Sequence, residues 1–208
     1  MYVALKNGLI SSFVARPLWY TGVDSDGNGV PVTDEYLASV GILPIDYTLP
    51  HYDPQRQIVV QNPVSQWLIL GNKAVVSYTI NNIPFETLRA RKLADINSKS
   101  ENTVAPYLEG YPEFEMKTWP IQRLEALNYA KDAASPTPWC DVAAAKRGVD
   151  RVTFISLVAA KSEAYTQISS IVAGYRQGLE VAINNIDANS PTAVDDLLKI
   201  VWTNPIPQ

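Results

Sequence analysis

The sequence predicts an α+β protein with a β-rich N-terminal half and a helical C-terminal half. Three observations support this prediction. Short β-branched and aromatic runs, separated by turn residues, fill the first half. Helix caps and breakers recur in the second half, and one apolar stripe runs from about residue 150 to 187. We expect three segments, which are a β-rich domain at 1–83, a helix with a linker or arm at 84–117, and a helical domain at 118–208.

Turn signals divide the first half into hairpins. Asn7-Gly8 lies between two apolar runs, and Gly71-Asn72 lies between the runs of "QWLILGNKAVVSYTI". Both pairs are typical of two-residue β-turns, because these residues accept a positive φ. "PQRQIVVQN" indicates a further strand. One short helix is expected in "TDEYLASVG", with Thr33 as its N-cap and Gly41 at its end.

The helices of the second half are predicted from caps and periodicity. "PFETLRARKLADINSK" predicts a helix over residues 85–97, followed by a looser segment. Thr118 is the expected N-cap of the next helix, with Pro120 in its first turn. Thr137 and Pro138 repeat this arrangement, and Gly148 ends that helix.

The apolar stripe predicts one long helix over about residues 150–187. Its apolar and small residues recur at a mean spacing of about 3.4, close to the 3.5 of a coiled-coil seam. One helix cannot bury this stripe alone, so it packs either on helices of its own chain or on other copies. Gly174 and Gly178 either permit close helix approach or merely weaken the helix. The expected oligomer-interface residues are Ile155, Tyr165, Ile168, Val172, Tyr175 and Leu179.

Composition and missing motifs argue against several function classes. The formal net charge of −4 does not favour nucleic-acid binding, which needs clustered Lys and Arg. The single cysteine, Cys140, excludes an intrachain disulfide, and no run of apolar residues is long enough to span a membrane. His51 is the only histidine and is interpreted as a loop residue. We therefore expect no catalytic residues, no cofactor, no resident metal and no enzymatic activity.

One motif matches a calcium-binding loop. Asp24, Asp26, Asn28 and Glu35 occupy ligand positions, Gly29 the required glycine, and Val30 the carbonyl position. However, "ARPLWYTGV" before the loop is not typical of an entering helix, and Pro31 lacks the backbone N–H that pairs such loops. The same residue types form polar turns between strands. A turn is the favoured interpretation, and a bound cation remains the alternative.

Residues 112–183 resemble a domain of unknown function found in tail proteins of bacteriophages and prophages. The N-terminal half is also similar to the start of such proteins, at "YDP" (Tyr52–Pro54) and "ETLRARKLADIN". The matching pieces of the second half are Thr118-Trp119, Gln122, Glu125-Ala126, Thr137-Pro138, Arg147-Gly148, Gly174 and Arg176-Gln177.

The resemblance implies a location and no reaction. The expected function is a structural adaptor or attachment protein of a phage tail or tail fibre, assembled in the bacterial host cytoplasm. Tail parts usually form closed symmetric oligomers, so a homotrimer that contacts other tail proteins is the first expectation. Two alternatives remain, namely a tail-fibre assembly chaperone that leaves the finished particle, and a calcium-dependent binder of host glycans.

Overall fold

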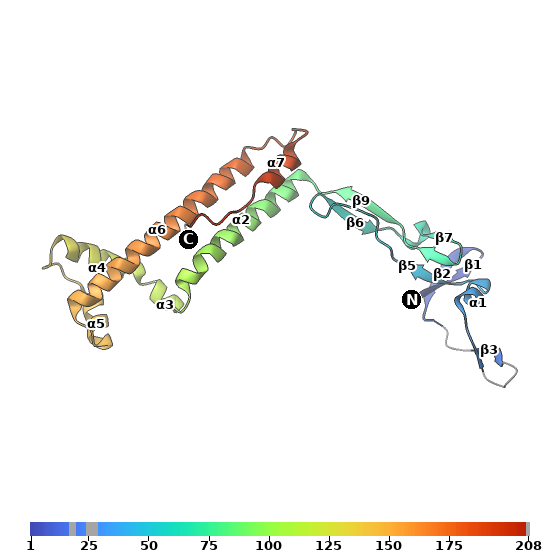
Figure 1. Cartoon of the computed structure of the whole chain (residues 1–208), viewed down its shortest axis with the longest axis horizontal. Helices are drawn as coiled ribbons and strands as arrows, with labels where there is room; N and C mark the ends of the chain where they lie inside the picture. Colours follow the sequence, from blue (N-terminus) through green and yellow to red (C-terminus); the bar gives the residue numbers. More distant parts are fainter. Residues whose placement is uncertain (17–19, 24–28, 207–208) are drawn as a thin grey trace. The chain divides into compact units, whose positions relative to one another are not determined.

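The computed structural model describes residues 1–16, 20–23 and 29–206. The chain divides into two compact units, Met1–Pro84 and Phe85–Gln208, each of which is described by itself. The first unit contains the strands and the second the long helices (Figure 1). The α+β class and the change from strands to helices near Pro84 are confirmed.

A five-stranded sheet forms the centre of the first unit. Its strand order is β2-β1-β5-β8-β7, and all neighbours are antiparallel except β5 and β8, which run parallel. The strands are β1 (Tyr2–Lys6), β2 (Leu9–Val14), β5 (Ile42–Asp46), β7 (Leu68–Leu70) and β8 (Lys73–Val75).

Both predicted hairpins are confirmed. Asn7 and Gly8 join β1 to β2 with φ values of 55° and 77°, and Gly71 joins β7 to β8 with φ 56°. These positive φ values explain why Asn and Gly occupy the turns, since a β-carbon is strained in that region. Turn chemistry in the sequence therefore set the register of two strand pairs.

The central strand β5 was not predicted, because Pro44 lies within it. Ile45 donates its backbone N–H to Met1 O of the chain segment before β1, at 3.3 Å. Hydrogen-bonding direction alternates along a strand, so the nitrogen of Pro44 faces β8. Pairing with β8 begins only at Ile45. The sheet therefore loses no backbone hydrogen bond through the missing N–H of Pro44.

Shorter elements complete the first unit. Two separate two-stranded ladders pair β3 (Tyr20–Val23) with β4 (Gly29–Pro31) and β6 (Gln57–Gln61) with β9 (Tyr78–Asn82). A 3₁₀ turn covers Val64–Gln66. The expected short helix is α1 (Asp34–Ser39), and Thr33 Oγ1 accepts the Tyr36 N–H at 3.2 Å as its N-cap.

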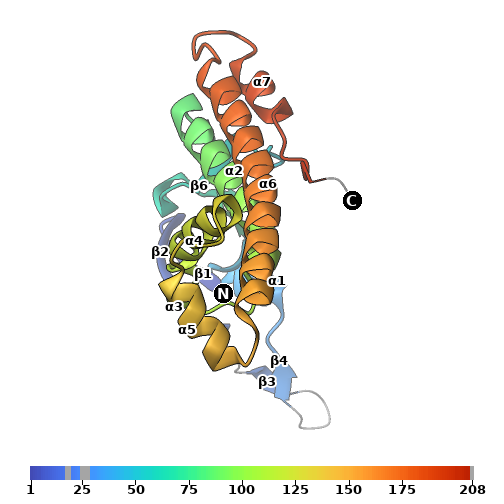
Figure 2. The same cartoon turned by 90° about the vertical axis from the view of Figure 1, so that its left-hand side faces the viewer.

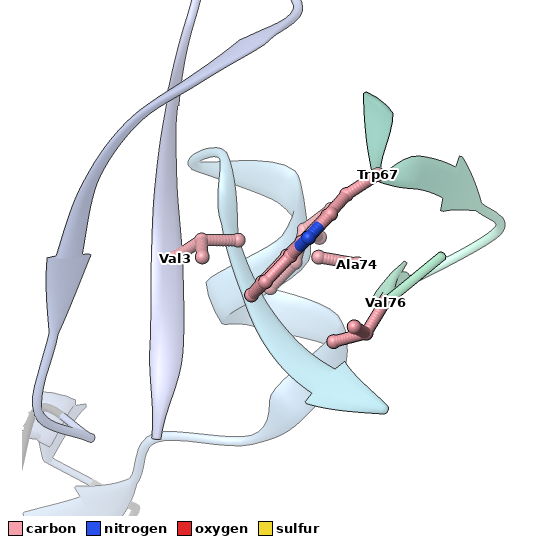
Figure 3. Close-up of a cluster of buried hydrophobic side chains, with 5 residues drawn as sticks. Val3, Trp67, Ala74 and Val76 are labelled. Carbon is pink, nitrogen blue, oxygen red and sulfur yellow. The ribbon is translucent and has the colours of Figure 1, made fainter. Parts of the chain in front are cut away.

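Trp67 is the centre of the core of this unit. Its indole packs among the buried side chains of Val3, Leu43, Ala74 and Val76 (Figure 3). The indole N–H donates to Asn62 O at 3.0 Å, so the only polar atom of the ring is satisfied. Phe13 and Tyr47 meet it edge-on, at centroid distances of 5.8 and 6.3 Å.

Six helices form the second unit. They are α2 (Phe85–Leu108), α3 (Glu113–Met116), α4 (Trp119–Lys131), α5 (Pro138–Arg147), α6 (Arg151–Asn184) and α7 (Ala193–Lys199). The predicted long helix is confirmed as α6, which spans 34 residues or about 50 Å. Asp150 caps it by accepting the N–H groups of Val152 and Thr153.

Helix α6 packs on the other helices of its own chain. Figures 1 and 2 show α2 beside one part of α6, and α4 and α5 pack on the N-terminal part. The tail after α7 returns along this pair. Lys92 Nζ donates to Ile200 O at 3.0 Å, and Tyr175 meets Trp202 edge-on at 5.1 Å. The apolar stripe is therefore largely covered within the chain.

One helix boundary in this unit was predicted wrongly. Helix α2 does not end at residue 97 but continues to Leu108, because the segment packs on α6 and tolerates Pro106 near its end. Thr118 and Thr137 occupy the predicted N-cap positions of α4 and α5, but neither side chain forms the expected cap hydrogen bond. The Thr118 hydroxyl instead donates to Glu115 O at 2.7 Å, and that of Thr137 donates to Asp141 Oδ1 at 2.8 Å.

Other local predictions hold. Pro120 and Pro138 lie in the first turns of α4 and α5, where no N–H is needed. Gly148 ends α5 in the left-handed region with φ 72°.

Replacing Trp67 by alanine tests the independence of the two units. We expect Trp67→Ala to lower the stability of the first unit by about 3 to 5 kcal/mol, because it empties the centre of that core. Helical circular dichroism, which arises mainly from the second unit, should keep its wild-type melting temperature. Phe114→Ala is the control, since Phe114 is 73 % exposed. Loss of both units in one transition would contradict the expected independence.

Candidate functional site

The only histidine and the only cysteine of the sequence lie in different units of the chain. His51 lies exposed in the loop between β5 and β6, as expected. Cys140 lies fully buried in α5, in the other unit. Among the described residues, no group of three or more His, Cys, Asp and Glu side chains is placed to hold a metal ion. Within the same residues, no helix is long and apolar enough to cross a membrane.

Glu125 is a buried carboxylate on α4. Its two oxygens accept the backbone N–H groups of Trp139 and Cys140, at 3.0 and 2.9 Å. These N–H groups belong to the first turn of α5, which has no partner for them within its own helix. Glu125 therefore caps α5 from a neighbouring helix and places a negative charge at the positive end of its dipole.

Arg151 completes this network at the start of α6. Its guanidinium donates to Asp141 Oδ1 at 2.8 Å and to Ser135 O at 3.0 Å, and it lies over the ring of Tyr129. Burial of the Cys140 thiol, together with the neighbouring Glu125 carboxylate, raises the pKa of that thiol to about 12. A thiol with so high a pKa stays protonated near neutral pH and is a poor nucleophile.

A groove of about 710 Å³ lies in the same unit, between the end of α2, α3, the start of α4 and α6. Three aromatic rings form its wall. Trp119 meets Tyr111 edge-on at 5.2 Å and Tyr165 at 5.5 Å. Lys161 Nζ donates to the Tyr111 hydroxyl at 2.7 Å. A concave wall that is mostly apolar and aromatic is the usual make-up of a binding site.

Helix α4 presents its apolar side chains to solvent. Ile121, Leu124 and Leu127 are 50, 60 and 49 % exposed, whereas the polar side chains of Gln122 and Glu125 are buried. This arrangement is the reverse of an ordinary surface helix. The three aliphatic residues recur every three positions, a signal that the sequence contained, yet the same spacing predicts a buried face. Contiguous exposed apolar side chains usually mark a contact with another protein.

The six residues predicted as an oligomer interface lie on the α6 side that meets the chain's own elements. Ile155 and Val172 are buried, Tyr165 contacts Trp119, and Tyr175 contacts Trp202. Ile168 lines the groove, and Leu179 is half-buried. Two of the six are thus covered within one chain. Their contact with another copy stays a prediction.

The calcium-loop motif falls partly outside the described residues, since Asp24, Asp26 and Asn28 are not among them. The backbone on both sides is described. Val23 of β3 pairs antiparallel with Gly29 of β4, and Glu35 lies in α1. The motif is therefore flanked by two paired strands and not by the entering helix of a calcium-binding helix pair.

No known family model, curated protein or solved structure matches this chain.

Removing the Glu125 carboxylate tests its role as a cap. We expect Glu125→Ala to lower the free energy of unfolding of the helical unit by about 2 to 4 kcal/mol, because two buried N–H groups lose their acceptor. Glu125→Gln keeps one acceptor oxygen and should lose less. Chemical denaturation followed by helical circular dichroism measures both. Equal stability of Glu125→Ala and wild type would show that water or another group replaces the carboxylate.

Calcium should not stabilise the protein, because strands flank the loop. We expect the same melting temperature in excess calcium and in EDTA. Binding to the folded state alone would raise the melting temperature with calcium concentration. Such a rise, lost in Asp24→Asn with Asp26→Asn, would instead establish a cation site.

Proposed function

We propose that this chain is a non-enzymatic structural component of a phage tail, acting as an adaptor between tail or tail-fibre proteins. The observation that carries the proposal is the outward apolar face of α4, formed by Ile121, Leu124 and Leu127. Exposing such an apolar face to water raises the free energy of the chain, and a neighbouring protein that covers the face removes this penalty. The sequence resemblance to phage tail proteins supports the location.

The total exposed surface supports a role within an assembly. The chain exposes 13,644 Å², and two separate compact domains of the same total mass would expose about 11,600 Å². The excess is about 2,000 Å², while a specific interface covers about 800 Å² of each partner. A chain that contacts two neighbours would bury an area of this size. A homo-oligomer, with a trimer as first expectation, fits this arithmetic.

The division into two compact units supports the adaptor role in particular. Each unit has its own core and its own uncovered apolar side chains. On the first unit the edge strand β7 exposes Leu68, Ile69 and Leu70. On the second unit α4 exposes the three aliphatic residues named above. Two such surfaces in one chain allow contact with two different neighbours.

The polar network of the helical unit supports a structural role rather than a catalytic one. Both oxygens of Glu125 are engaged with backbone N–H groups, and the thiol of Cys140 is held protonated. These groups are therefore committed to the helix junction.

Mass spectrometry of purified particles from the phage or prophage that encodes the chain tests the proposal. We expect the chain at a fixed ratio to other tail proteins, because an adaptor stays in the finished particle. Host-cell proteins of similar abundance serve as the contamination control. A chain that is present during infection but absent from mature particles would contradict the adaptor function and favour the assembly chaperone.

A further inference from the structure

Helix α6 carries a second regular repeat beside the stripe that meets α2 and α4, and two of its positions, Leu157 and Ala164, also line the rim of the groove. It begins at Leu157, advances alternately by three and four residues, and ends at Val181. We call these eight positions the outer seam. This spacing averages 3.5 residues and is typical of a helix that pairs along its length with another helix. We propose that copies of this chain associate through the outer seam, with α6 of one copy packed along α6 of another.

Every position of the outer seam is exposed in the single chain. Its three large side chains, Leu157, Ile171 and Val181, are 43, 41 and 58 % exposed. A β-carbon added at Gly174 or Gly178 would meet no atom within 4 Å. Unlike the covered stripe, this face therefore has room for a partner.

The geometry of the seam favours a helix as the partner. The seam spans 24 residue steps, or about 36 Å. Its 3.5-residue repeat drifts around α6, and a second helix that supercoils with it stays in contact along the whole length. The other seam positions are mostly small, among them Ala160 and Ala164. Small residues let two helix axes approach to about 8 Å. The same small residues would leave gaps against an irregular surface.

Charge favours a second copy over an unrelated helix. No position of the seam is charged, so identical seams meet without repulsion. Charged residues on the two flanks of such a seam normally select a different partner. Here the flanking positions carry only Lys161 and Glu163, which have opposite signs and lie on opposite flanks of the seam. The charged pair Arg176 and Glu180 lies outside the seam and is joined within the chain at 2.9 Å.

The area predicts reversible association. A contact about 36 Å long on a helix about 10 to 12 Å wide covers a strip of roughly 400 Å² on each copy. The pair then buries about 800 Å², which is below the range of stable specific interfaces. We therefore expect association that depends on concentration in the micromolar range. This inference rests on the proposed role as an assembly part and identifies the surface through which copies meet.

Sedimentation analysis of the full chain over a range of concentrations tests the seam. We expect wild type to form oligomers as concentration rises, and Ile171→Lys to weaken association about tenfold or more, because it buries a charge at the contact. Ala173→Lys is the matched control, since Ala173 is exposed on the same helix between the two repeats. It should associate like wild type.

A wild-type chain that stays monomeric throughout would overturn the inference, as would Ile171→Lys associating as tightly as wild type. Thermal melting shows whether each variant is folded, and Val181→Lys replaces Ile171→Lys if the latter is not. The particle composition measured by mass spectrometry is independent of this result. A chain found in particles but monomeric in solution would thus contradict the seam alone, and oligomers of a chain absent from particles would contradict the tail function alone.

Discussion

The covered apolar stripe of α6 is the constraint on which the helical unit depends. A helix of 34 residues with such a stripe is unstable in water by itself, because isolated helical turns contribute little without tertiary packing. Helix α2 covers one part of α6, and α4 and α5 pack on its N-terminal part. The tail adds the contact between Trp202 and Tyr175. Each shorter helix therefore takes its position from α6.

The junction of α4, α5 and α6 shows how one polar requirement shapes a surface. The first turn of α5 needs acceptors for its N–H groups, and Glu125 supplies them from α4. That contact turns the polar side of α4 inward, with Gln122 next to Glu125 on the buried face. Ile121, Leu124 and Leu127 then lie on the opposite side and reach solvent. The apolar face that we assign to a neighbouring protein thus follows from the way α5 is capped.

Helix α6 likewise has one face that is covered within the chain and one that is exposed. Its inner repeat packs within the chain, whereas the outer repeat is exposed, with small residues at half of its positions and large apolar ones near the ends and the middle. In the first unit, Trp67 is buried in the core of the sheet, whereas the side chains of the edge strand β7 are exposed. Both units therefore combine a packed core with exposed apolar side chains. This combination is the physical basis for proposing that the chain is part of an assembly.

Features that depend on neighbouring residues could be predicted from the sequence alone. The hairpins at Asn7-Gly8 and Gly71-Asn72, the Thr33 cap and the long helix were predicted, since positive φ, capping and periodicity act over a few positions. Long-range contacts were needed to place Pro44 in a central strand, to extend α2 to Leu108, and to let Glu125 rather than the Thr137 side chain cap α5. These contacts also decided which face of α4 and of α6 is covered. These outcomes depend on contacts between residues far apart in the chain, where packing outweighs local preference.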